Sequence, residues 1–125
     1  MIIRIEGESD IPIYTQITNQ IIEGIARGEI ARGDSLPSVR AFAADLGVNM
    51  HTVNKSYHEL EKKGIIKIVP KSGAIISPTE QMSEEKMQQI FTELKPVIAE
   101  ALVSGMNKKD IRDMVSSILE ELKER

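Results

Sequence analysis

The chain has 125 residues, of which 41% are apolar and 28% are charged, values typical of a folded protein rather than a disordered one. It contains no cysteine, which excludes disulfides, cysteine-ligated zinc and thiol catalysis. No apolar run is long enough to cross a bilayer and no secretion signal opens the sequence, so we expect a cytoplasmic protein without a membrane partner.

The formal net charge is −3, but the charge is unevenly distributed along the chain. Between Ser38 and Ser77 there are six basic and three acidic residues, a local charge of +3. Residues 78–125 contain seven basic and ten acidic residues. An acidic C-terminal region therefore masks a mildly basic middle segment, which is compatible with a nucleic-acid partner.

The first elements in chain order are a short strand and a helix. Residues 1–5 alternate weakly between apolar and polar, which suggests a strand. Asp10 as a cap and Pro12 in the first turn predict the start of a helix, and Gly28 predicts its end. Its buried face repeats every four residues, at Ile13, Ile17, Ile21 and Ile25. Residues 33–37, which are rich in turn formers, predict a loop.

Two further helices are separated only by residues 47–48. Ser38 caps the first of them, and Asn49 caps the second, which should end near Gly64. Residues 65–69 and 74–77 are two β-type runs joined by a turn, which predicts a hairpin. Three helices followed by a hairpin describe a winged helix-turn-helix, mainly α with a small β-hairpin, over residues 1–77.

Residues 83–125, which follow a linker at 78–82, predict two helices capped by Ser83 and Asn107. Pro96 should kink or split the first of these helices. Their apolar residues follow heptad-like steps, at Met87, Phe91, Leu94, Ile98 and Ala101, then at Ile111, Val115, Ile118 and Leu122. We predict a dimerisation region, since each stripe is longer than its one local partner can cover. Packing within a single chain is the alternative.

The helix-turn-helix arrangement predicts which side chains meet double-stranded DNA. The start of the second helix enters the major groove, and its polar residues are Asn49, His51, Thr52, Asn54 and Lys55. Lys55 is better suited to a phosphate than to a base. Arg40, early in the preceding helix, reaches a phosphate or a guanine edge. The tip of the hairpin is suited to contact a flanking minor groove through Lys71, Ser72 and Gly73.

Other interpretations of the same residues remain open. Arg40 could pair with Asp45 on the protein surface, Lys71 could only aid solubility, and Gly73 could only serve the turn. His51 and His58 share a helix face, but zinc ligands on one helix are usually four residues apart, so we expect no metal. Because no phosphate loop, nucleophile elbow or metal triad is present, we expect neither an enzyme nor a cofactor.

Residues 13–77 resemble the GntR family of bacterial transcription regulators. The matching motifs are PIYTQITNQIIEGIARGEIARGDSLPSVRAFAADLGVNMHTVNKSYHELEKKGII and, in the hairpin, KSGAII. The short tail with two helices is similar to the YtrA subfamily, whose members lack a separate ligand-binding domain and dimerise through those helices. The resemblance implies a homodimeric repressor, acting on its own operon or on neighbouring ABC transporter genes.

The resemblance also implies roles for individual residues. The arginine of the family's LPS-x-R motif, which contacts DNA, matches Arg40, and the wing glycine matches Gly73. The start of the recognition helix matches Asn49, His51, Thr52 and Asn54. Relatives often carry arginine or proline where this chain has Met50, which cannot donate a hydrogen bond. A winged helix that binds another protein, and a regulator gated by an unidentified small-molecule effector, are the alternatives.

Overall fold

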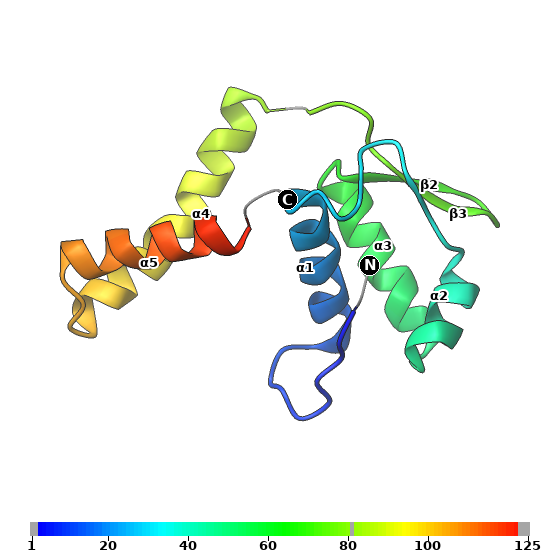
Figure 1. Ribbon diagram of the computed structural model, residues 1–125, viewed down its shortest axis with the longest axis horizontal. Helices are drawn as coiled ribbons and strands as arrows, with labels where there is room; N and C mark the ends of the chain where they lie inside the picture. Colours follow the sequence, from blue (N-terminus) through cyan, green and yellow to red (C-terminus); the bar gives the residue numbers. More distant parts are fainter. Residues whose placement is uncertain (1–2, 81, 123–125) are drawn as a thin grey trace. The chain divides into compact units, whose positions relative to one another are not determined.

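The computed structural model describes residues 3–80 and 82–122, so the other residues of the predicted linker and C-terminal region lie outside it. The described residues up to Thr79 form one compact unit, and those from Glu80 onward form a second. Figure 1 shows helices α1 to α3 and a small sheet in the first unit, and helices α4 and α5 in the second. Each unit is described by itself below.

The predicted N-terminal strand is not present in Ile3–Ile5, and Met1 and Ile2 lie outside the described residues. Instead, side-chain amides of α1 take the place of a neighbouring strand. Gln20 accepts from the Arg4 amide at 2.9 Å and donates to its carbonyl at 2.7 Å. Gln16 makes the same pair of bonds with Glu6 at 2.8 and 3.0 Å. These bonds satisfy the extended backbone without a sheet.

Helix α1 spans Ile13–Ala26 and packs through the predicted isoleucine face, with Ile17 and Ile21 fully buried. Asp10 does not cap it, since the capping position belongs to Pro12 and no side chain bonds there. The expectation for Asp10 was therefore wrong. Proline is tolerated at this position because the backbone N–H that it lacks would have no acceptor within the helix.

Helices α2 (Val39–Leu46) and α3 (Met50–Lys62) are capped as expected. The Ser38 hydroxyl accepts from the Ala41 amide at 3.1 Å, and the Asn49 side chain accepts from the His51 amide at 2.7 Å. Gly47 ends α2 with φ 69°, a left-handed conformation that glycine adopts without strain. The turn between the helices is consequently short, which fixes α2 against α3.

Among the described residues the sheet has three strands, one more than the predicted hairpin. Strands β2 (Ile66–Val69) and β3 (Gly73–Ile76) form the expected hairpin. Strand β1 (Ser35–Leu36), which was expected to be loop, pairs with β3, with Leu36 opposite Ala74. The strand order is β1-β3-β2, all antiparallel. Two residues are too few to show alternation, so only the tertiary pairing reveals this strand.

The core of the first unit joins its helices to its sheet. The largest fully buried side chains are Tyr57, Ile17, Ile21, Leu60, Ile76 and Val53. They come from α1, α3 and β3, so the predicted apolar faces meet in one cluster. This core holds α3 in place and leaves its other face open.

Helices α4 (Glu84–Val103) and α5 (Lys108–Glu121) begin at their predicted caps. Ser83 accepts from the Lys86 amide at 3.1 Å, and Asn107 accepts from the Asp110 amide at 2.8 Å. Helix α4 continues through Pro96, so of the two expected outcomes, a kink or a split, the split does not occur. Proline removes a single backbone donor, and the helix extends on both sides of it.

Candidate nucleic-acid interface

The first two turns of α3 present a polar face to solvent. Thr52 is half-buried there, whereas four of the predicted DNA-contacting residues are exposed: Asn49, His51, Asn54 and Lys55. The opposite face of the helix is buried, through Val53, Tyr57 and Leu60. Met50, the first residue of the helix, is also exposed, with 42% of its surface accessible. The sequence-predicted contacts therefore share one accessible surface.

Two polar contacts join α3 to α1. The hydroxyl groups of Thr18 and Ser56, both buried, lie 2.8 Å apart. The Lys55 ammonium lies 4.1 Å from the centroid of the Tyr14 ring, a cation–π contact. Lys55 is thus held against α1 in the free protein, with its charge still exposed.

Arg40 is the second residue of α2 and is exposed. The alternative pairing with Asp45 is not found: within residues 3–80 and 82–122, the Arg40 guanidinium makes no hydrogen bond or ion pair. The Asp45 carboxylate is likewise exposed. The Arg40 charge is consequently available to an external anion such as a DNA phosphate.

The wing is the turn between β2 and β3. Lys71 and Ser72 are exposed at its tip, and Lys71 adopts φ 67°, a left-handed conformation unusual for a residue with a side chain. The Ser72 amide closes the turn by donating to the Val69 carbonyl at 3.0 Å. The tip therefore projects one ammonium and one hydroxyl into solvent.

Gly73 has a different environment from its neighbours in the wing. It is buried, with φ 106°, and a Cβ there would overlap the Leu36 carbonyl oxygen and lie 2.8 Å from the Pro37 backbone. The close approach of β3 to β1 thus requires glycine at this position. Its DNA contact stays a prediction, whereas its role in the fold is visible.

Tyr57 contributes a contact that the sequence did not indicate. It lies in the buried face of α3, and its hydroxyl also donates to the Pro37 carbonyl at 2.7 Å. Burial raises the pKa of this hydroxyl above its usual value. The one available signal was the residue type, since a buried tyrosine usually finds a partner for its hydroxyl.

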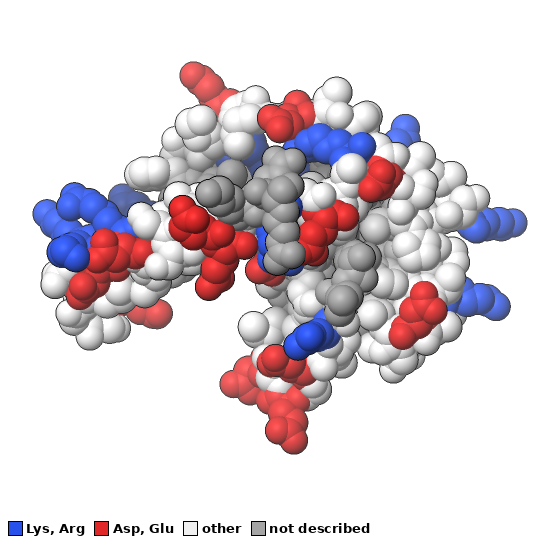
Figure 2. Space-filling view, viewed as in Figure 1, with Lys and Arg blue, Asp and Glu red and all other residues white. Residues whose placement is uncertain are grey.

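Charge is unevenly distributed over the first unit. Figure 2 shows basic side chains projecting at the edge formed by the hairpin and α2, at the right of the view. Acidic side chains gather instead on the loop that precedes α1, at the bottom of the view. The basic edge is the one that carries Arg40 and the wing.

The second unit exposes most of its apolar residues. Neither α4 nor α5 contains a buried residue. The predicted dimerisation residues divide into two sets. Half-buried are Ile98, Ala101, Ile111 and Leu122, and exposed are Met87, Phe91, Leu94, Val115 and Ile118. Other exposed apolar residues of α4 and α5 lie outside the predicted stripes: Ile90, Val97, Leu102, Val103, Met114 and Leu119.

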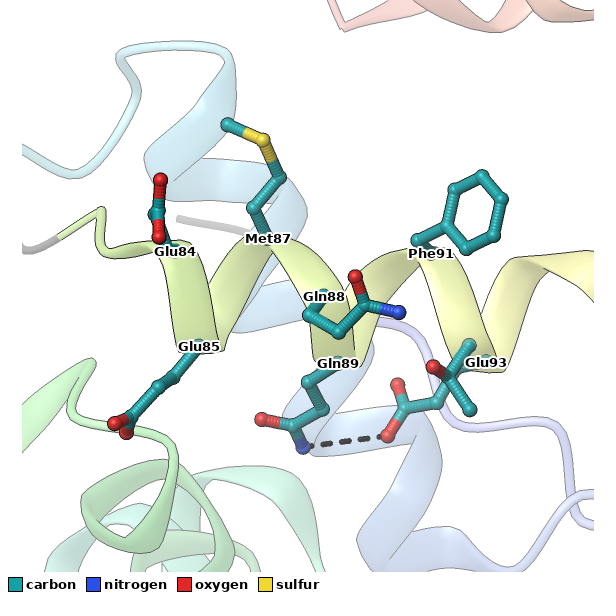
Figure 3. A pocket seen from close by; sticks show the side chains of 8 residues that line it. Glu84, Glu85, Met87, Gln88, Gln89, Phe91 and Glu93 are labelled. Carbon is teal, nitrogen blue, oxygen red and sulfur yellow. Dashed lines mark hydrogen bonds between the residues drawn. The ribbon is translucent and has the colours of Figure 1, made fainter.

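An open groove of about 950 Å³ lies along the start of α4. Figure 3 shows Met87 and Phe91 projecting from one side of the helix, while Gln89 and Glu93, joined by a 3.3 Å hydrogen bond, project from another. The side chains of Met87 and Phe91 are 61% and 60% exposed. The lining of this groove combines these two exposed apolar side chains with polar ones such as Glu84 and Glu85.

Residues 3–80 and 82–122 contain no group of three His, Asp or Glu side chains placed to hold a metal ion. Within the same ranges, no helix has the length and apolar character needed to cross a membrane.

Comparison with known proteins identifies a family. Residues 13–76 match the bacterial regulatory proteins of the gntR family. The chain is 36% identical to the HTH-type transcriptional repressor YtrA of Bacillus subtilis over 97% of its own length and 95% of that protein. This match includes both units, not only the winged helix.

Two solved structures are similar along nearly the whole chain. A transcriptional antiterminator from Listeria monocytogenes is 31% identical, with a TM-score of 0.89 over 98% of this chain and 92% of the other. YtrA from Sulfolobus acidocaldarius, a GntR-family transcription factor, is 42% identical, with a TM-score of 0.60 over 95% and 97%. The similarity confirms the expected winged-helix fold with C-terminal helices.

Proposed function

The chain belongs to the GntR family and is a DNA-binding transcription regulator rather than an enzyme, and we propose that it represses transcription as a homodimer on an operator with two half-sites. The observation that carries the proposal is the exposed polar face of α3, together with the unpaired guanidinium of Arg40 among the described residues. Operator DNA is chromosomal, so the proposal places the protein in the bacterial cytoplasm.

On this proposal, the start of α3 enters the major groove. Specificity comes from side chains that can hydrogen-bond to base edges: Asn49, His51, Thr52 and Asn54. Affinity that depends on salt comes from cationic groups directed at phosphates, namely Arg40, Lys55 and Lys71. Ser72 and Gly73 bring the wing backbone to the neighbouring minor groove. The contact with the Tyr14 ring already restrains Lys55 in the free protein, so less conformational entropy is lost when it binds DNA.

The second unit supplies the dimer. Its exposed apolar side chains lose contact with water when a second copy covers them, which stabilises association. Such a dimer presents two copies of α3 to half-sites roughly 34 Å apart, one helical turn of DNA. A bound dimer then blocks the promoter sterically. The name of the Bacillus subtilis relative, a repressor, supports this direction of regulation.

The test is a fluorescence-anisotropy titration of the full chain against the DNA upstream of its own gene, with scrambled duplex as competitor. We expect tight binding that resists the competitor and weakens by on the order of a hundredfold or more between about 50 and about 200 mM salt. Binding no tighter than to the scrambled duplex would contradict autoregulation. Binding that salt does not change would contradict the proposed phosphate contacts, since a packed interface responds little to salt.

A further inference from the structure

The segment Leu36–Pro37, which leads from β1 into α2, is held by β3 and α3. Leu36 pairs with Ala74 of β3, and the Pro37 carbonyl accepts the Tyr57 hydroxyl of α3 at 2.7 Å. The glycine at position 73 lets β3 approach the backbone of this segment. The wing, the recognition helix and the start of α2 therefore meet at one point.

Tyr57 is the side chain through which α3 reaches that point. It is fully buried, and its ring lies 6.1 Å from the Phe42 ring of α2, tilted by 45°. Phenylalanine would fill the same space, so packing alone does not require the hydroxyl. A hydroxyl is costly to bury unless it forms a hydrogen bond, and here the bond is to Pro37.

Arg40 lies three residues after Pro37, in the first turn of α2. Gly47 holds the other end of this eight-residue helix close to α3. The bond from Tyr57 thus fixes the end of α2 from which Arg40 projects, relative to the helix that carries Asn49 and His51. Because that end is already fixed in the free protein, less conformational entropy is lost when Arg40 contacts DNA.

We propose that Tyr57 is a positioning residue for DNA binding, which acts on the Arg40 contact through its hydroxyl bond to Pro37. The inference rests on the proposed contact between Arg40 and DNA. It goes beyond that contact because it assigns part of the affinity to a buried side chain that never touches DNA.

The experiment is a double-mutant cycle on the full chain with Tyr57→Phe and Arg40→Ala. The probe is a labelled duplex that the wild-type protein enriches from a random-sequence pool. Tyr57→Phe alone should weaken binding roughly fivefold, the effect of one lost hydrogen bond. Arg40→Ala alone should weaken it about tenfold. Together they should weaken it only about tenfold, since the hydroxyl acts through Arg40.

Ser56→Ala is the matched control. It removes one buried hydrogen bond from the same helix, but that bond goes to Thr18 of α1 rather than to the α2 segment. The melting temperature should fall to a similar extent in Ser56→Ala and Tyr57→Phe. Affinity for the duplex should change by less than about twofold in Ser56→Ala, because the start of α2 is untouched.

The remaining outcomes separate this inference from the function on which it rests. A double mutant weakened by the product of the two single effects, or an unchanged Tyr57→Phe, overturns the positioning role. Equal weakening by Ser56→Ala overturns it too, because general destabilisation would then explain the effect. If Arg40→Ala alone leaves the affinity unchanged, the proposed Arg40 contact fails, and the inference fails with it.

Discussion

The two units of this chain use apolar residues in opposite ways. In the first, isoleucines of α1, the buried face of α3 and strand β3 close into one core. In the second, α4 and α5 together bury no residue, and Phe91 and Val97 remain 60% and 62% exposed. The first unit forms a buried core by itself, whereas the second leaves its apolar side chains exposed.

The difference indicates where each unit obtains its stability. Burying a side chain such as Phe or Leu stabilises a protein by about 1.5–3 kcal/mol. The exposed apolar stripes of α4 and α5 do not gain this free energy in the single chain. A monomer seldom leaves so much apolar surface in water. The first unit should therefore respond to substitutions as an independent domain, and the second as an interface.

The largest effect is expected inside the first unit, at Gly73. Gly73→Ala would force a Cβ against the Leu36 carbonyl at a positive φ, and we expect a loss of about 3–4 kcal/mol in the free energy of unfolding. Chemical denaturation measures it. Gly7→Ala, where a Cβ meets nothing within 4 Å, is the control and should be nearly neutral. Equal stability of both variants would contradict the claim that the close approach of β3 to β1 requires glycine at position 73.

The next effect is expected on the apolar face of α4. Phe91→Asp should separate the proposed dimer and weaken DNA binding by on the order of a hundredfold, while the first unit stays folded. Sedimentation and anisotropy measure the two changes. Gln89→Asp places the same charge on a different side of α4 and should leave the dimer intact. A dimeric Phe91→Asp variant would remove this face from the interface.

A smaller effect is expected at the basic edge of the first unit. Arg40→Ala should weaken DNA binding at least about tenfold without changing the melting temperature, because its side chain is exposed. Arg112→Ala, an exposed arginine in α5, controls for the loss of one positive charge. If both variants lose affinity equally, net charge rather than a specific contact would be responsible.

The smallest effect is expected between α1 and α3. Tyr14→Leu removes the ring beneath Lys55 and should lower the free energy of unfolding by about 0.5–1 kcal/mol. In a Lys55→Gln background the same substitution should cost measurably less. Denaturation of the four proteins of this cycle gives the coupling, and a coupling of zero would show that the contact contributes nothing.

Local sequence signals predicted the helices of both units, because each helix follows an apolar period and every described helix except α1 begins at a side-chain cap. Ser38, Asn49, Ser83 and Asn107 all cap as expected, since a capping side chain bonds within three residues of itself. Features that depend on distant segments were missed. Strand β1 exists because β3 lies beside it, and the N-terminal segment is satisfied by glutamines of α1.

The candidate site follows the same division. The polar face of α3 could be predicted from helical spacing alone, because neighbours on a helix face are set by sequence. The bonds of Tyr57 to Pro37 and of Lys55 to Tyr14 join residues 20 and 41 positions apart, so no local pattern predicts them. The resemblance to a family supplied the residue roles that spacing could not.

The most direct test of the account is the stoichiometry of the complex with DNA. Sedimentation of the full chain with a duplex that it enriches from a random pool should give a complex of two chains, each of 13.9 kDa, per duplex. Moving the half-sites apart by half a helical turn should abolish that complex, because the proposed dimer would fix the spacing of its two α3 helices. One chain bound per duplex, with an affinity that the spacing does not change, would contradict it.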